Sequence, residues 1–303
     1  MGKTICCIGS TGFIGSEIYS KLKKDNKYNL YRFSTKKNKY IDKCNEQYFD
    51  FLIFSSGIHP ESHNDNPNIY FKNKEIFRKT EKIFKKSNFI IFISSFKTLI
   101  DENNKTISSN NKYNFYRHDT HYGKSKIILE KIFIKFCNKH NKKFIIVCPS
   151  HVIGPKDKNF SPNGNFLNKI INKRIIIIPD VNISITDNRN LSYFIANILE
   201  EKKFLNKKIL VSDISIRMRE YIKLIKKGKF YILINLSFFW VKQIYKFFNF
   251  LKKLKIIKKN VISSNLYNYI KLNPIIYEKY NSQKYSFKST IKDTVDYFRS
   301  MKP

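Results

Sequence analysis

The chain has 303 residues, 42% of them hydrophobic, which excludes a disordered chain and allows one large domain or two unequal ones. The formal net charge of +35 suggests an attraction to polyanions such as nucleic acids or anionic membranes. Only eight of the 58 basic residues are arginine, however, and the lysines are spread along the whole chain, which argues against a specific nucleic-acid partner.

Residues 4–8 form an apolar run that is followed at once by three glycines and an amphipathic stretch. A buried strand that turns sharply into a helix leaves backbone N–H groups unpaired at the helix N-terminus, where a pyrophosphate can bind. Gly9 would let the chain leave the strand tightly, Gly12 would let the backbone approach the phosphates, and Gly15 would let helix and strand pack closely. We therefore expect a dinucleotide cofactor; the alternative is that the glycines only punctuate a loop.

The second predicted strand, residues 28–34, bears on the choice of cofactor. An NAD site usually has an acidic side chain about twenty residues beyond the glycines, where it holds the ribose hydroxyls. This part of the chain has no Asp or Glu and offers Arg32, Ser34, Thr35 and Lys36 instead. Because hydroxyls and cations suit a 2′-phosphate, the sequence favours NADP over NAD, with Ser34 as a cofactor contact.

Three further apolar runs are predicted to be parallel strands, at residues 51–55, 89–93 and 144–148. Helical spacing occupies residues 69–86 and 122–138 between them. This alternation predicts an α/β fold with a doubly wound parallel sheet and right-handed crossovers. Ser56 and Gly57 follow the first of these runs, where small residues would let the cofactor lie against the sheet. The polar loop at 101–121 is long enough to be a lid or a substrate edge.

Tyr122 and Lys126 lie four residues apart in the segment YGKSK, at the start of a predicted helix. This spacing places both side chains on one helical face. An ammonium group near a phenol stabilises the phenolate, so we expect a lowered pKa for Tyr122 and a role as general acid/base. The pair alone is weak evidence, because a chain with 19 tyrosines and many lysines produces such pairs by chance.

The order of the motifs strengthens this interpretation. The glycine loop, with Thr11 beside Gly12, is followed by a strand that ends at Ser94 and Ser95, then by YGKSK and by PSHVIGP at residues 149–155. This succession resembles the extended short-chain dehydrogenases/reductases, and specifically the NAD-dependent epimerase/dehydratase family that acts on nucleotide sugars. The resemblance extends over residues 4 to about 155 and implies a Rossmann fold.

The resemblance also implies roles for individual residues. Tyr122 would exchange a proton with the substrate, Lys126 would hold the nicotinamide ribose, and Ser95 would hydrogen-bond the same substrate oxygen. The backbone from Thr11 to Ile14 would cradle the pyrophosphate, and Pro149 would begin a segment that shapes the nicotinamide side. The predicted cofactor-binding residues are Gly9, Thr11, Gly12, Phe13, Ile14, Gly15, Ser34, Ser56, Gly57, Asn73, Tyr122, Lys126 and Pro149.

The chain departs from the family pattern at two places. Dehydratases of this family have an Asp-Glu pair after the Ser/Thr, whereas Phe96 and Lys97 follow Ser95 here, which leaves epimerisation or carbonyl reduction. Family members also tend to have an acidic residue before the helix that returns to the sheet. This chain has Asn190 and Leu191 there, so we expect altered packing at that helix.

The resemblance weakens beyond residue 154. We expect residues 1–154 to form the NAD(P)-binding Rossmann domain and residues 155–303 a smaller substrate-binding portion, with parts of about 184–215 returning to the Rossmann sheet. The most hydrophobic stretch, residues 230–250, has an uncharged part that is too short to span a bilayer. We expect its aromatic face to be buried in the substrate-binding portion, the alternative being a membrane interface beside the basic run at 252–259.

The sequence thus predicts an NAD(P)-dependent epimerase or reductase of a nucleotide sugar. The five cysteines lie mostly in apolar runs without metal-ligand spacing, and no signal peptide precedes the first strand, so we expect a cytoplasmic protein without a metal. The first alternative is a non-catalytic dinucleotide-binding protein, and the second is a membrane-surface or polyanion-binding protein. Weak contact with a membrane surface and a homodimer are compatible with each of these predictions.

Overall fold

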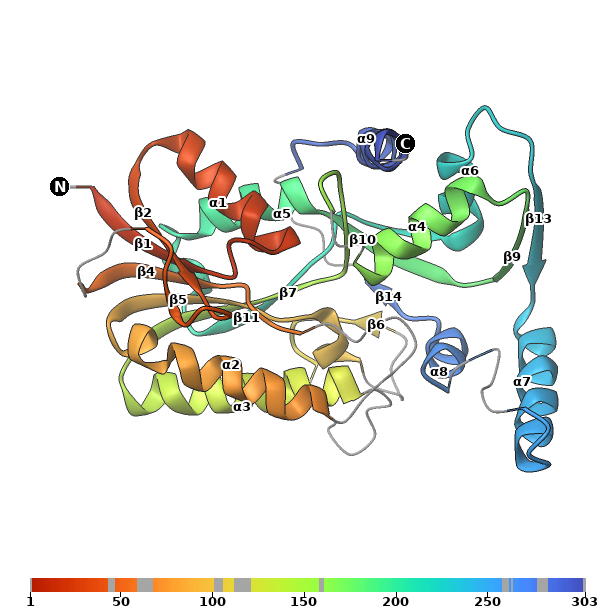
Figure 1. Ribbon diagram of the computed structural model, residues 1–303, viewed down its shortest axis with the longest axis horizontal. Coiled ribbons are helices and arrows are strands. Elements are labelled where there is room, and N and C mark those ends of the chain that lie inside the picture. The colour runs from red at the N-terminus through yellow and green to blue at the C-terminus, as the bar shows by residue number, and fades with distance from the viewer. Residues whose placement is uncertain are drawn as a thin grey trace.

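The computed structural model describes residues 2–42, 47–58, 68–100, 106–111, 121–157, 161–257, 262, 264–276 and 283–301. The larger part of the molecule is built on a seven-stranded sheet (Figure 1). In spatial order its strands are β11 (Lys207–Val211), β7 (Lys143–Pro149), β5 (Ser87–Ile93), β4 (Phe49–Phe54), β1 (Lys3–Ile8), β2 (Tyr28–Ser34) and β3 (Lys39–Tyr40). All neighbouring strands are parallel except β3, which is antiparallel to β2. The chain proceeds outward from β1 in both directions, so β1 and β4 flank the point where ligands bind in such sheets.

Helices cover both faces of this sheet (Figure 1). One face carries α1 (Phe13–Asp25) and α5 (Asn188–Ile198), and the other carries α2 (Asn68–Lys85) and α3 (His121–Lys139). The central strands are apolar on both sides because both faces are covered. On the α2–α3 side, the ring of Phe92 stacks between Phe54 and Phe133, at centroid distances of 5.2 and 4.6 Å. The predicted doubly wound Rossmann fold is confirmed.

The smaller part of the molecule contains a second sheet in the order β12-β10-β8. Its strands are β8 (His151–Ile153), β10 (Asn182–Asp187) and β12 (Ile214–Arg217), and the helices around it are α4 (Pro162–Asn172), α6 (Met218–Ile225) and α9 (Phe287–Ser300). A separate apolar core, which includes Leu167, Tyr221 and Phe298, holds these elements together. Between β10 and β12 the chain returns to the larger part, where it forms α5 and β11.

One short parallel pair, β6 (Thr106–Ile107) with β14 (Ile275–Ile276), lies between the two parts, and β14 also contacts β10 and β12. Two 3₁₀ turns, Phe96–Leu99 and Lys202–Phe204, belong to the larger part. Most of the predicted lid or substrate edge at 101–121 lies outside the described residues, and so does part of the basic run at 252–259.

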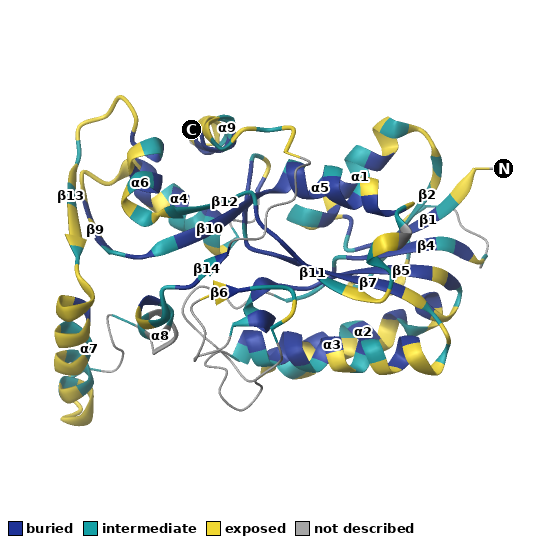
Figure 2. Cartoon of the chain, turned by 180° about the vertical axis from the view of Figure 1, so that it is seen from behind, coloured by how far each residue is buried: buried dark blue, intermediate teal, exposed yellow. Residues whose placement is uncertain are grey.

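The stretch 230–250 forms an exposed strand and helix, so its predicted burial is wrong. The parallel pair β9 (Ile175–Pro179) and β13 (Ile232–Leu236) leads into α7 (Phe238–Lys253), which is followed by α8 (Ser264–Leu272). The side chains of Phe239 and Trp240 are 60% and 58% exposed. The reason is that α7 packs on α8 along one side only, and Figure 2 shows much of the remainder exposed. Among the described helices, none has the length and apolar character needed to cross a bilayer.

The helix α5 begins with a buried carboxylate, which corrects the expectation from Asn190. Asp187 is the N-cap residue of α5, and its side chain accepts a hydrogen bond from the backbone N–H of Arg189 at 2.6 Å. The family's acidic residue, which the sequence analysis expects to be missing at Asn190, is therefore present as Asp187, about one helical turn before that position. Asn190 instead binds the segment that precedes α9, because its Oδ1 accepts hydrogen bonds from the backbone N–H groups of Lys284 and Tyr285 at 3.0 and 2.9 Å.

Candidate active site

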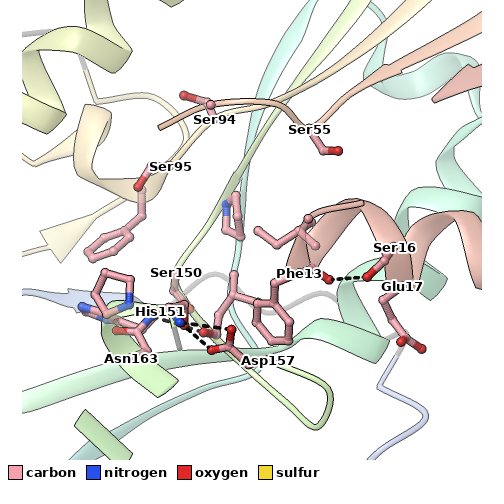
Figure 3. A pocket seen from close by; sticks show the side chains of 18 of the residues that line it. Phe13, Ser16, Glu17, Ser55, Ser94, Ser95, Ser150, His151, Asp157 and Asn163 are labelled. Carbon is pink, nitrogen blue, oxygen red and sulfur yellow. Dashed lines mark hydrogen bonds between the residues drawn. The ribbon is translucent and has the colours of Figure 1, made fainter. Parts of the chain in front are cut away.

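A cavity of about 960 Å³ lies at the carboxyl ends of the parallel strands. Ser55 follows β4, Ser95 follows β5 and Ser150 follows β7, and all three line it. Figure 3 shows Ser95 and His151 on one side of the cavity and Ser16 and Glu17 of α1 on the other. Because parallel strands end at one edge of a sheet, segments that are far apart in the sequence meet here.

The glycine loop packs against the end of β4. Gly9 has a φ of +86°, and a Cβ atom there would lie 2.8 Å from the backbone of Ser55 and Ser56. A Cβ atom at Gly15 would overlap the carbonyl oxygen of Gly9 and the hydroxyl of Ser55. Neither Gly9 nor Gly15 lines the cavity. Their contribution in this structure is close packing, which fixes the loop that does line it.

The N-terminus of α1 faces the cavity without a capping side chain. Thr11, Gly12, Phe13 and Ile14 all line the cavity, and the N-cap residue Gly12 has no side chain to accept the first N–H groups. The first turn of α1 holds no acidic residue. Unpaired N–H groups at a helix start attract an anion, so these residues fit the pyrophosphate of a dinucleotide.

The structure brings Ser95, Tyr122 and Lys126 together. Tyr122 and Lys126 lie one turn apart on α3, and the Tyr122 side chain forms a hydrogen bond with the side chain of Ser95. The Nζ atom of Lys126 lies 5.9 Å from the centroid of the Tyr122 ring. Both side chains are nearly covered, with exposed fractions of 6% for Tyr122 and 5% for Lys126. Two of the three, Ser95 and Tyr122, line the cavity.

The protonation of this group differs from the expectation. Burial raises the pKa of Tyr122 above its ordinary value, and the hydrogen bond with Ser95 opposes this rise. The predicted lowering of the Tyr122 pKa by Lys126 is therefore wrong for the protein alone. The reason is that the cost of burying the phenolate outweighs the groups that would stabilise it. Lys126 is buried as well, and desolvation lowers its pKa to about 8, against the attraction of Glu130.

Gly57 and Asn73 position Lys126 and its helix. A Cβ atom at Gly57 would lie 2.9 Å from the Nζ atom of Lys126, so the glycine leaves room for the ammonium group. The buried Asn73 side chain accepts a hydrogen bond from the backbone N–H of Ile58 at 2.9 Å and donates one to Ser125 Oγ at 2.7 Å. Asn73 thus joins the loop after β4 to α3, and it does not line the cavity.

The residues predicted near the cofactor ribose lie at the end of β2, outside the cavity lining. Ser56 Oγ hydrogen-bonds Thr35 Oγ1 at 3.2 Å, and Ser34 Oγ accepts from the backbone N–H of Lys37 at 3.2 Å. An acidic residue is nevertheless close, because the β2–β3 hairpin brings Asp42 to Arg32. Their carboxylate and guanidinium groups pair at 2.6 Å.

Several residues of the segment PSHVIGP line the cavity, among them Pro149. His151 also lines it, and its Nδ1–H donates to the Ser184 carbonyl oxygen at 3.0 Å. Desolvation lowers the pKa of His151 to about 4, and Lys97 adds to this, so the ring is neutral and its Nε2 is an acceptor. Sequence reasoning missed this residue, although the imidazole in a family motif at a strand end was a usable signal.

Beneath the cavity, a buried ion pair joins four elements. Glu130 on α3 is fully buried, and its carboxylate accepts from the Ser94 hydroxyl and, at 2.6 Å, from Lys208 Nζ on β11. The same ammonium group donates to Thr98 Oγ1, in the 3₁₀ turn, at 2.7 Å. This network fixes α3, the end of β5 and the edge strand relative to one another.

Glu130→Gln is expected to lower the free energy of unfolding by about 2 kcal/mol, because it leaves the mostly buried ammonium group of Lys208 without its counter-charge. Urea denaturation measures this change. Adding Lys208→Met to Glu130→Gln should recover part of the loss, since it removes the uncompensated charge. A double variant that is less stable than Glu130→Gln would contradict this role of the ion pair.

Comparisons with known proteins agree with this geometry. The family model for the NAD dependent epimerase/dehydratase family matches residues 5–176. Among solved structures, the protein gox2253 resembles the chain with a TM-score of 0.78 at 16% identity, over 99% of this chain and 98% of that one. A nucleoside-diphosphate-sugar epimerase of Pseudomonas aeruginosa gives 0.70 at 11%, over 99% and 98%. UDP-glucuronic acid 4-epimerase of Bacillus cereus, in complex with NAD, gives 0.68 at 14%, over 99% and 97%.

At these identities the likeness to solved structures is one of fold. A search of curated protein sequences finds no match.

Proposed function

The chain belongs to the NAD-dependent epimerase/dehydratase family, as its motifs predict, and on this basis we propose that it is an epimerase or reductase of a nucleotide sugar. The observation that carries the proposal is the meeting of Ser95, Tyr122 and Lys126. Ser95 and Tyr122 line the cavity that the glycine loop also lines, and Lys126 lies behind them. The bacterial UDP-glucuronic acid 4-epimerase with the same fold supports a nucleotide-linked sugar as the class of substrate.

The proposed cofactor is a nicotinamide dinucleotide. When bound, its oxidised ring accepts a hydride and adds a positive charge to the cavity. The N–H groups at the start of α1 would hold the pyrophosphate, and small residues at the ends of β4 and β5 would leave room along the sheet. Lys126, which lies behind Gly57, would hydrogen-bond the nicotinamide ribose.

Tyr122 is proposed as the group that carries the proton. Its phenol oxygen would take the proton from the sugar hydroxyl as the hydride leaves that carbon, and would return it in the reverse step. Ser95 would hydrogen-bond the same sugar oxygen and keep it aligned with the phenol. Because burial raises the pKa of Tyr122, the phenolate depends on nearby positive charge. Lys126 and Lys97 supply it, with Nζ atoms 5.9 and 6.0 Å from the centroid of the Tyr122 ring.

The residues around Ser95 favour epimerisation or reduction over dehydration. Loss of water from a sugar needs an additional acid and base, and Phe96 and Lys97 occupy the positions of that pair. Two carboxylates line the cavity. Glu17 lies on α1, on the side of the cavity away from Ser95, and the two oxygens of Asp157 accept from the backbone N–H of Ser161 at 3.0 and 2.9 Å. Asp157 therefore serves as a structural acceptor in this proposal.

NADP is proposed as the preferred form of the cofactor. Fewer residues support this preference in the structure than in the sequence. Asp42 neutralises Arg32, so the guanidinium is not a free 2′-phosphate ligand. Ser34 and the exposed Lys36 remain as the groups that would hold that phosphate. Binding titrations should give a lower dissociation constant for NADP than for NAD, and the reverse order would reject this preference.

The proposed activity is tested with the purified protein. Acid release of bound nucleotides and mass spectrometry identify the cofactor, and incubation with a panel of UDP-sugars and either dinucleotide is followed by NMR for new epimers and by the absorbance of reduced nicotinamide. We expect one substrate to be interconverted or one carbonyl sugar to be reduced. Tight dinucleotide binding without turnover on the whole panel would favour a non-catalytic dinucleotide-binding protein.

A further inference from the structure

An exposed apolar surface, which no other described element covers, lies at the end of the molecule formed by β9, β13 and α7. We call it the distal apolar face, and its members are Ile175, Ile177, Ile232, Ile234, Phe239, Trp240, Phe247, Phe250 and Leu254. Figure 1 shows β13 and α7 in line at the end of the molecule away from the N-terminus, and Figure 2 shows both mostly exposed. Large contiguous apolar surfaces on soluble proteins mark sites of interaction.

The strand part of this face follows from the pairing of β9 with β13. Ile175 lies opposite Ile232, and Ile177 lies opposite Ile234. Side chains alternate along a strand, and the intervening Ile176 is buried in the core of the smaller part. The four paired isoleucines therefore point outward together, away from α4 and α6.

The helical part continues the same face. Val241 is the buried anchor of α7, and it packs with Ile270 of α8. At about 100° per residue, the exposed residues Phe239, Trp240 and Phe247 fall on the opposite side of the helix, together with Phe250 and Leu254. Both α7 and β13 thus turn their inner sides toward the body of the molecule and their aromatic or aliphatic sides away from it.

The positive charge around the distal apolar face indicates the kind of partner that it binds. From residue 221 to residue 277 the sequence has twelve lysines and no aspartate or glutamate. Three of these lysines, Lys242, Lys246 and Lys253, are exposed on α7 and flank the aromatic stripe on one side. An apolar stripe bordered by lysines matches the boundary between lipid headgroups and acyl chains, because lysine side chains reach up to phosphates while aromatic rings enter the apolar layer.

We propose that the distal apolar face binds the surface of an anionic phospholipid bilayer. Phe239, Trp240 and Phe247 enter the headgroup boundary, and the lysines of α7 contact lipid phosphates. A second copy of the chain is a poorer occupant, since a twofold interface would bring the lysines of both copies together without an acidic partner in this stretch. This inference does not depend on the proposed enzymatic activity.

Trp240 is the single tryptophan of the chain and reports directly on this surface. Full-length protein is mixed with vesicles of phosphatidylcholine alone or of phosphatidylcholine with phosphatidylserine, at physiological salt. With anionic vesicles we expect co-flotation and a blue shift of the Trp240 emission. Three lysines near the surface correspond to about a hundredfold stronger partition than to phosphatidylcholine alone. Unchanged Trp240 emission at saturating anionic vesicles would overturn the proposal.

Matched variants distinguish binding through the distal apolar face from non-specific attraction of the protein to vesicles. Phe239→Ser with Phe247→Ser should weaken partition at least about tenfold, since two exposed rings no longer enter the lipid. The control Phe71→Ser removes an aromatic ring that is 75% exposed on α2, at a distance from the face, and should leave partition unchanged. Equal losses in both variants would reject the assigned surface.

The lysine pair offers a second matched comparison. Lys242→Gln with Lys246→Gln should weaken binding to anionic vesicles about tenfold or more, whereas Lys135→Gln with Lys139→Gln, exposed at the same spacing on α3, should change it little. Equal effects would show non-specific attraction by the whole basic surface and would reject the assigned face. Sedimentation without vesicles tests whether a second copy of the chain binds this face instead. A dimer with blue-shifted Trp240 emission would assign the face to a second copy and overturn the proposal.

Discussion

Tyr122→Phe is expected to reduce turnover by about a hundredfold or more while the affinity for the dinucleotide stays unchanged. The substitution removes the phenol oxygen and keeps the ring, so the packing of this nearly buried side chain is preserved. It also removes the hydrogen bond with Ser95. With the phenol oxygen gone, the proton of the sugar hydroxyl loses its proposed acceptor. The measurement is steady-state turnover on the substrate found in the panel, beside a binding titration with the dinucleotide.

Tyr221→Phe is the matched control for this variant. Tyr221 is fully buried in the core of the smaller part and does not line the cavity. Loss of its hydroxyl should leave turnover near the wild-type value, which excludes a general effect of removing a buried phenol. If Tyr122→Phe retained near-full turnover, Tyr122 would not be the proton carrier, whatever the substrate.

Gly15→Ala is expected to lower the free energy of unfolding by about 3 kcal/mol or more and to abolish dinucleotide binding. The added methyl group would overlap the carbonyl oxygen of Gly9 and the hydroxyl of Ser55, so α1 could not keep its distance from the ends of β1 and β4. Because the Gly9 oxygen belongs to the backbone, a side-chain rotation cannot relieve the overlap. Urea denaturation and a binding titration measure the two effects.

Gly12→Ala is expected to weaken dinucleotide binding with little effect on the free energy of unfolding. A methyl group at Gly12 would lie 3.3 Å from the Gly9 carbonyl oxygen, a tight contact that a small shift relieves. We expect this variant to unfold close to the wild type but to bind the dinucleotide more weakly, because Gly12 lines the cavity where the pyrophosphate is proposed to lie. Equal stability of the Gly15 and Gly12 variants would show that α1 can shift, contrary to the packing described.

The strands of the large sheet could be predicted from the sequence because continuous apolar runs between turn residues are typical of parallel strands that helices cover on both faces. The strand predicted at 28–34 is β2 with the same bounds, and the run at 89–93 lies within β5. The order of motifs was equally informative, since a strand end at Ser95 and a helix start at Tyr122 and Lys126 belong to the same edge of such a sheet.

Three features needed the folded chain. Asp42 reaches Arg32 through the β2–β3 hairpin, a pairing that spacing along the sequence does not express. The pKa of Tyr122 depends chiefly on how completely the phenol is buried, and a helical spacing carries no measure of burial. The aromatic stretch at 230–250 is hydrophobic enough for a core, but hydrophobicity does not specify which element will cover it.

The cap of α5 has a consequence for how the protein is made. Asp187 accepts a hydrogen bond from Thr290, and Arg189 pairs with Asp293, both at 2.6 Å, although about one hundred positions separate the partners along the chain. On the ribosome, α5 therefore emerges long before Thr290 and Asp293, although the Asp187 cap and its ion pair with Arg189 need only neighbouring residues. The contacts that fasten α9 to the start of α5 form only when synthesis has nearly finished.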